Sequence, residues 1–154
     1  MKHMGMKISK LTLFVSIAVI AASSYSCGKS EVGGASFAVD GAANGAQVVP
    51  VSTSSATGSI SAYYNGGDNQ LKGVIKWSGL SGSPTAIHIH AGAVGRNGYP
   101  YFLMVNVPTG TTDSLNFTSA FTQAQETITY GNYYFDIHTA AYPNGEIRGQ
   151  LVAH

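Results

Sequence analysis

The sequence predicts a single all-β domain, an antiparallel β-sandwich, preceded by an export signal. Glycine is frequent, with 19 in 154 residues, while charged residues make up only 10% of the chain. This composition is typical of strands joined by tight turns. After the first 22 residues no long run of helix-forming residues occurs. Short alternating segments recur with turn signals between them, a pattern that indicates a β-sandwich or small barrel.

The chain begins with a basic stretch and an apolar run. Residues 1–10 contain three lysines, and Leu11–Ala22 is almost wholly apolar. This run is shorter than the roughly 20 residues that a membrane-spanning helix needs. A charged start followed by an apolar segment of this length fits a secretory signal peptide.

Small residues and a cysteine follow the apolar run. The arrangement resembles a bacterial lipoprotein signal, although Ser24 stands where the usual motif has leucine. The resemblance implies that residues 1–26 are removed, that Cys27 is lipidated and that residues 27–35 form a flexible tether. The alternative is ordinary secretory cleavage nearby, which leaves Cys27 as a free thiol.

Lipidation of Cys27 implies a location at the cell envelope, with the chain anchored in the lipid bilayer of a bacterial membrane, at the outer membrane or the cell surface. From Cys27 onward, five basic residues stand against seven acidic ones. Such a balance argues against nucleic acid as a partner, because that partner requires a concentrated basic surface. With one cysteine in the chain, no intrachain disulfide forms.

Alternation and turn residues predict the strands in order. The first half has strands at 36–40, 56–64, 70–79 and 86–90, with a loop over 41–50 and a hairpin turn at 65–69. The second half has strands at 101–107, 115–120, 127–130, 132–139 and 146–153, with a single helical turn within 121–126. Trp77, the only tryptophan, falls on the apolar face of its strand and is expected to anchor the core.

The segment Ala86–Gly98 is the most informative part of the sequence. His88 and His90 share one strand face, roughly 6–7 Å apart, while two isoleucines occupy the other face. His138 lies on the polar face of a later strand, next to Asp136. Three neutral imidazoles with one open position form a reasonable site for copper or zinc.

Two interpretations of these histidines stay open. In the first, His88, His90 and His138 bind one transition-metal ion, and Asp136 and Glu146 orient the imidazoles. In the second, the histidines hydrogen-bond the glycine-rich loop and the Asn144–Gly145 turn, while Glu146 and Arg148 form an ion pair at the sandwich surface. Convergence of the three rings on one point would favour the first.

Several separated motifs resemble the CHRD domain, which is named for chordin and also occurs in bacterial secreted proteins and lipoproteins. They are His88–His90, Gly92, Gly95–Gly98, Tyr134, Ile137–Thr139 and Tyr142–Leu151, with Gly45–Pro50 and Ala56–Gly58 upstream. The resemblance covers roughly residues 36–153. It implies an immunoglobulin-like or superoxide-dismutase-like sandwich, and it implies little about activity.

A weaker resemblance links the His-x-His strand to copper–zinc superoxide dismutase. In that family, such a strand and a distant histidine supply copper ligands on the outside of a β-barrel, and His88, His90 and His138 correspond to them. This sequence has neither a bridging histidine nor a zinc loop, and it cannot form that family's disulfide. Dismutase-like redox activity is therefore a remote alternative.

The sequence shows no pattern of an enzyme's active site. It contains neither a nucleophile elbow nor a selected pair of carboxylates. The glycine-rich loop does not precede a predicted helix, so it does not form a phosphate site at a helix N-terminus. We therefore expect a non-enzymatic binding or adhesion domain with an unknown protein or glycan ligand, and a copper- or zinc-binding module as the alternative.

Overall fold

The computed structural model describes residues 34–121 and 128–154, and nearly all of its regular structure is antiparallel β. All its strands belong to one unit, Val32–His154. The strands of the first half are β1 (Phe37–Asn44), β2 (Thr57–Asn65), β3 (Gln70–Ser78) and β4 (Pro84–Ala91), with the short helix η1 (Gly45–Gln47) after β1. Those of the second half are β5 (Tyr99–Leu103), β6 (Asp113–Ala120), β7 (Tyr133–Thr139), β8 (Ile147–Gln150) and β9 (Val152–Ala153).

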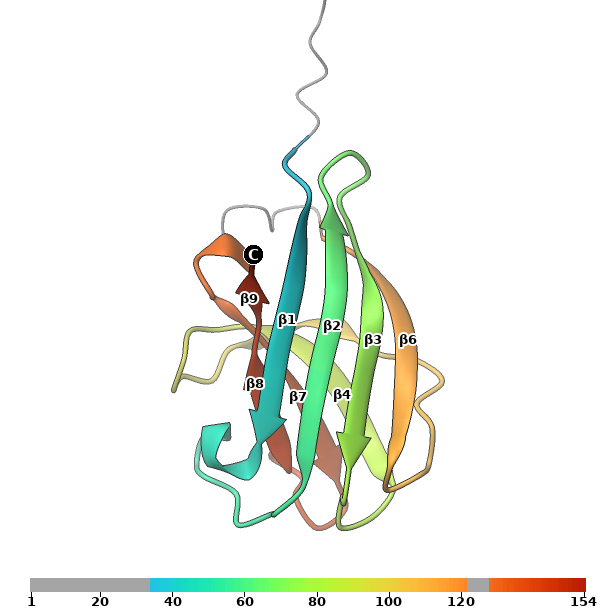
Figure 1. Ribbon diagram of the computed structural model, residues 1–154. Coiled ribbons are helices and arrows are strands. Elements are labelled where there is room, and N and C mark those ends of the chain that lie inside the picture. Colours follow the sequence, from blue (N-terminus) through green and yellow to red (C-terminus); the bar gives the residue numbers. More distant parts are fainter. Residues whose placement is uncertain (1–33, 122–127) are drawn as a thin grey trace, which may run out of the picture. The chain divides into compact units, whose positions relative to one another are not determined.

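The strands follow the order β5-β4-β7-β8-β1-β2-β3-β6 in one sheet, and β9 also pairs with β1. The sheet folds into two layers that face each other. Figure 1 shows β1, β2, β3 and β6 in front of β4, β7 and β8. This arrangement confirms the predicted all-β sandwich.

The core fills the space between the two layers. The side chains of Tyr64, Leu71 and Ile75 come from the front layer, and those of Ile87 and Phe135 come from the rear layer; all five are fully buried. Trp77 is 3% exposed and donates its indole N–H to the carbonyl of Gly110 at 2.8 Å. The expected role of Trp77 as a core anchor is confirmed.

Several expected elements differ from the structure. Strand β1 continues to Asn44 through the segment expected to be a loop, because it pairs with β2 along its whole length. Strand β5 ends at Leu103 instead of continuing to Val107. Ile128 and Thr129 are helical rather than extended. The helical turn expected within 121–126 falls largely on residues outside those described.

The export signal and Cys27 also lie outside the described residues. Within the described part of the chain, no helix is long and apolar enough to cross a bilayer.

Candidate metal centre

The register between β4 and β7 brings the polar side chains together on the outer face of the rear layer. His88 lies opposite Asp136, and His90 lies opposite Tyr134. His138 lies opposite Ala86, one position along the same face from Asp136. Since alternate residues of a strand face opposite sides, the isoleucines between the histidines point into the core. The apolar half of the alternation therefore fixes the direction of the imidazoles.

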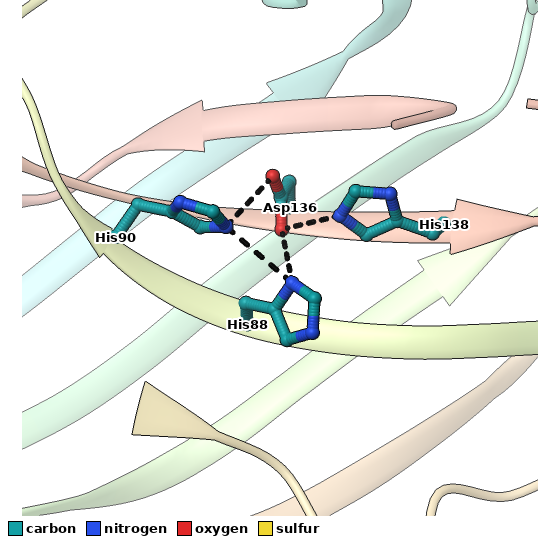
Figure 2. Close-up of side chains that lie close together, drawn as sticks. All are labelled: His88, His90, Asp136 and His138. Atoms are coloured by element: carbon teal, nitrogen blue, oxygen red, sulfur yellow. Dashed lines mark hydrogen bonds and ion pairs between the residues drawn. The ribbon is translucent and has the colours of Figure 1, made fainter. Parts of the chain in front are cut away.

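Asp136 lies at the centre of the three imidazoles (Figure 2). His90 Nε2 is 3.2 Å from Oδ2 of Asp136, and His138 Nε2 is 3.1 Å from Oδ1. His88 Nδ1 is 3.7 Å from Oδ1 and 3.4 Å from His90 Nε2. One ligand atom from each of the four residues lies within 4.8 Å of the others. The structure thus brings the three predicted histidines together and adds a carboxylate that was expected only to orient them.

The far nitrogens of two imidazoles are held by backbone carbonyls. His90 Nδ1 lies 2.9 Å from the carbonyl oxygen of Gly98, and His138 Nδ1 lies 3.0 Å from that of Pro143. Because a carbonyl only accepts, both Nδ1 atoms carry the proton in these bonds. In the neutral ring the lone pair is then on Nε2, which faces Asp136. A backbone hydrogen bond of this kind is the usual outer contact of a metal-binding histidine.

The contacts within the cluster alter its acid–base properties. Burial opposes the charged form of Asp136, but its contacts with His138 and His90 lower the pKa of that carboxyl to about 2. Burial lowers the pKa of His90 and His138, yet contact with Asp136 outweighs it and raises both. The pKa of His88 is lowered, mainly by burial. Asp136 is therefore an anion throughout the neutral range, available to pair with a cation.

Two atoms in the cluster are buried without a hydrogen-bond partner among the described residues. They are Asp136 Oδ1 and His138 Nε2, which approach each other but lie outside hydrogen-bond geometry. A buried acceptor without a partner costs about 1–3 kcal/mol. Either a proton on the His138 ring or a cation between the two atoms relieves that cost. The cluster therefore favours a positive charge at its centre.

The separations also suit a metal ion. Four donors at about 2.0–2.1 Å from one tetrahedral ion lie roughly 3.3–3.4 Å from each other. Four approaches in the cluster, which involve both oxygens of Asp136, are 3.1, 3.2, 3.4 and 3.7 Å, while the set of one ligand atom per residue spans up to 4.8 Å. The more distant ligand atoms must therefore move closer together around a tetrahedral ion. Three imidazole nitrogens with one carboxylate oxygen form a donor set suited to zinc or copper.

An aromatic ring supports the cluster from the side. The Tyr134 ring stacks on His90 with the ring centroids 4.8 Å apart and the planes inclined by 8°. The Tyr134 hydroxyl accepts the N–H of Gly98 at 3.2 Å, so Gly98 contacts both rings. A Cβ at Gly98 would clash with the carbonyl of Ala91, which explains why this position needs glycine. Tyr134 was not predicted to have this role, although its place on the polar face of β7 was a usable signal.

The expected surface ion pair between Glu146 and Arg148 is wrong. Glu146 is fully buried and accepts hydrogen bonds from Ser54, Ser81 and Thr139 at 2.6–2.8 Å. Arg148 is 2% exposed, and its Cζ lies 3.5 Å from the centre of the Tyr134 ring. Loops cover this face of the last strands, so side chains expected to face solvent are buried.

The loop after β4 is tied to β8. Arg148 Nη2 donates to the carbonyl of Ala93 at 2.9 Å, and Gln150 Nε2 donates to that of Gly92 at 2.9 Å. Two of the motifs that carry the family resemblance, Gly92 and Tyr142–Leu151, are therefore in contact with each other. The hydrogen bonds of Arg148 and Gln150 thereby connect the loop that follows β4 to β8.

A family model described as the CHRD domain matches residues 40–151. This chain belongs to the CHRD domain family. The match confirms the expected CHRD resemblance, and it covers all four residues of the cluster. Comparisons with curated proteins and with solved structures each gave no match. The resemblance to copper–zinc superoxide dismutase therefore stays a prediction.

Proposed function

We propose that this chain is a non-enzymatic binding module of the cell envelope that holds one copper or zinc ion between His88, His90, Asp136 and His138. The observation that carries the proposal is the convergence of four ligand atoms within 4.8 Å. Two of the imidazoles are already fixed by backbone carbonyls with Nε2 toward the cluster. A cluster held this way loses little conformational freedom when an ion binds.

Two strands of the same sheet hold the ligands, which supports a stable site. The pairing of β4 with β7 fixes the backbone beneath every ligand, and the inner faces of both strands belong to the core. Binding sites on strands are held more firmly than sites on loops. We expect the metal-free and metal-loaded chains to share one backbone arrangement around the ligands.

The envelope location rests on the first 27 residues. A basic start, a short apolar run and a cysteine support export and lipidation at Cys27, with the folded domain tethered to a bacterial membrane. In such a place the module meets metal ions and ligands from outside the cytoplasm. This part of the proposal does not depend on the metal site.

The metal content of the full chain tests the proposed function. After equilibration with zinc or copper and removal of excess ion, elemental analysis is expected to give one ion per chain. A double variant, His88→Ala with His90→Ala, is expected to bind at least 100-fold more weakly, because it removes two of four donors.

A matched control uses a histidine outside the cluster. His154 is exposed and follows β9, and its Nε2 lies 3.9 Å from Oδ2 of Asp40 on β1, which is not a ligand strand. His154→Ala is expected to leave the stoichiometry unchanged. A wild-type chain that retains no more ion than the double variant would contradict the proposal.

A further inference from the structure

A pocket of about 430 Å³ borders the candidate metal centre. Three of the four ligand residues, His90, Asp136 and His138, form part of its wall, and His88 does not. An ion held by the cluster therefore has a cavity beside it, on the side of three of its ligands. A zinc or copper ion with four protein donors can expand its coordination to five, so the cavity offers room for one further ligand.

The rest of the wall is made of neutral groups. Val49, Pro50 and Pro143 contribute apolar surface, while Asn97 and Asn144 contribute amides. Asn97 Nδ2 donates to the carbonyl of Val49 at 2.8 Å and so holds the two sides of the pocket together. Asn144 is exposed, and its amide makes no hydrogen bond to another described residue. This amide is free to donate to a molecule in the pocket.

The charges favour an anion as that molecule. A divalent ion with the single carboxylate of Asp136 and neutral imidazoles leaves a net positive charge at the pocket wall. Among the described residues, Asp136 is the only acidic one in that wall. The guanidinium of Arg148 is buried and packs on the ring of Tyr134, which is also part of the pocket wall. Its positive charge adds to the positive potential in the pocket.

We propose that an ion held by these four residues accepts a fifth ligand on the pocket side and that this ligand is a small anion, either a carboxylate or an inorganic ion, with Asn144 donating a hydrogen bond to it. The inference rests on the proposed function, because it requires the ion. It goes beyond that function in assigning the site a second ligand and in giving Asn144 a role in recognition. The chain then couples metal binding to anion binding at one place.

Azide is the probe that tests this inference, with the copper(II)-loaded full chain. Azide bound to copper(II) produces a charge-transfer absorption band and changes the electron paramagnetic resonance spectrum. We expect both changes to saturate with one azide per copper. The variant with His88→Ala and His90→Ala is expected to give neither, which rules out copper bound elsewhere on the chain.

Two variants of Asn144 locate the anion. Asn144→Ala removes the hydrogen-bond donor and is expected to weaken azide binding about 10-fold, the usual effect of losing one hydrogen bond to a charged group. Asn144→Trp is expected to fill the pocket, so that copper is retained while the azide response is lost. Asn116, which is exposed on β6, provides the matched control. Asn116→Ala and Asn116→Trp are expected to bind azide like the wild type.

The possible outcomes distinguish failure of the anion position from failure of the metal site. A chain that binds one copper but shows no response to azide overturns this inference and leaves the metal site intact. A chain that binds no copper overturns both. An azide response that Asn144→Trp leaves unchanged overturns the assignment to this pocket. Displacement of azide by acetate assigns the position to carboxylates, and displacement by chloride or phosphate alone assigns it to inorganic anions; both support an anion position.

Discussion

The ring of Tyr134 lies parallel to the imidazole of His90, with the centroids 4.8 Å apart and the planes inclined by 8°. The two residues face each other across the β4–β7 pair, so their backbone positions are fixed by the sheet. Gly98 also links the two side chains, because its carbonyl accepts a hydrogen bond from His90 Nδ1 and its N–H donates one to the Tyr134 hydroxyl. Tyr134 thus restricts the orientation of a candidate ligand without being one.

Replacement of Tyr134 tests this positioning role. Tyr134→Leu removes the stacking surface and the hydroxyl, and we expect zinc affinity to fall by about 10-fold to 100-fold, as for other outer contacts of metal ligands. Tyr134→Phe keeps the ring and is expected to lose less. Competition with a chelator of known zinc affinity measures both. Equal affinity in Tyr134→Leu and the wild type, with both folded, would show that the ring has no positioning role.

Asp136 is predicted to control the protonation of two histidines in the metal-free protein. In Asp136→Asn the attraction of the carboxylate is gone while the burial of His90 and His138 remains. The pKa of both imidazoles should therefore fall below the ordinary histidine value, from above it in the wild type. Proton NMR titration of the metal-free chains measures the change. Unchanged titration of His90 and His138 would contradict the central position of Asp136.

Glu146 is predicted to stabilise the fold by joining three segments. Its fully buried carboxylate accepts hydrogen bonds from Ser54, Ser81 and Thr139. Glu146→Ala removes the shared acceptor and leaves hydroxyls without it, so we expect the free energy of unfolding to fall by about 2–4 kcal/mol. Urea denaturation measures this change. A loss below about 0.5 kcal/mol, the range of ordinary surface substitutions, would contradict the role.

The same carboxylate predicts a pH dependence. Burial opposes ionisation of Glu146, but the hydrogen bonds from Thr139 and Ser81 outweigh it and lower the pKa. Because the folded pKa lies below the unfolded one, the contribution is fully present above the unfolded value of about 4.3 and is lost as pH falls through the folded value. The difference in unfolding free energy between the wild type and Glu146→Gln should therefore shrink in acid. A difference that is constant from neutral to acidic pH would oppose this account.

Cys27 is predicted to carry the membrane anchor. Cys27→Ser should move the chain from the membrane fraction of the producing bacterium to a soluble or secreted fraction, because the lipid attachment site is lost. Mass spectrometry of the wild-type chain should show a lipid mass on the peptide that begins at Cys27. A wild-type chain that carries a free thiol at Cys27 would favour ordinary secretory cleavage instead.

Alternation in the sequence was sufficient to predict most strands and the outward direction of the site histidines. The isoleucines beside His88 and His90, and Phe135 and Ile137 on either side of Asp136, decide the faces because only one side of each strand meets the core. The third histidine was predicted for the same reason. The family resemblance added the order of the motifs and was confirmed by the match over residues 40–151.

The burial of the polar face could not be predicted from alternation. Alternation places Glu146 and Arg148 at outward, polar positions of the last predicted strand. Both are nevertheless buried, because loops far away in the sequence cover them. Likewise, the central place of Asp136 depends on the register of β7 against β4, which fixes that residue opposite His88. Register between strands separated by more than 40 residues depends on the tertiary structure. The sequence therefore predicted which residues form the site better than it predicted the role of each residue in it.

Anomalous diffraction from crystals of the zinc-loaded protein tests the central claim most directly. We expect one zinc ion per chain, about 2.0–2.1 Å from His88 Nδ1, His90 Nε2 and His138 Nε2 and about 2.0–2.2 Å from an oxygen of Asp136. A zinc peak at any other place, or none above background within reach of these four residues, would contradict it.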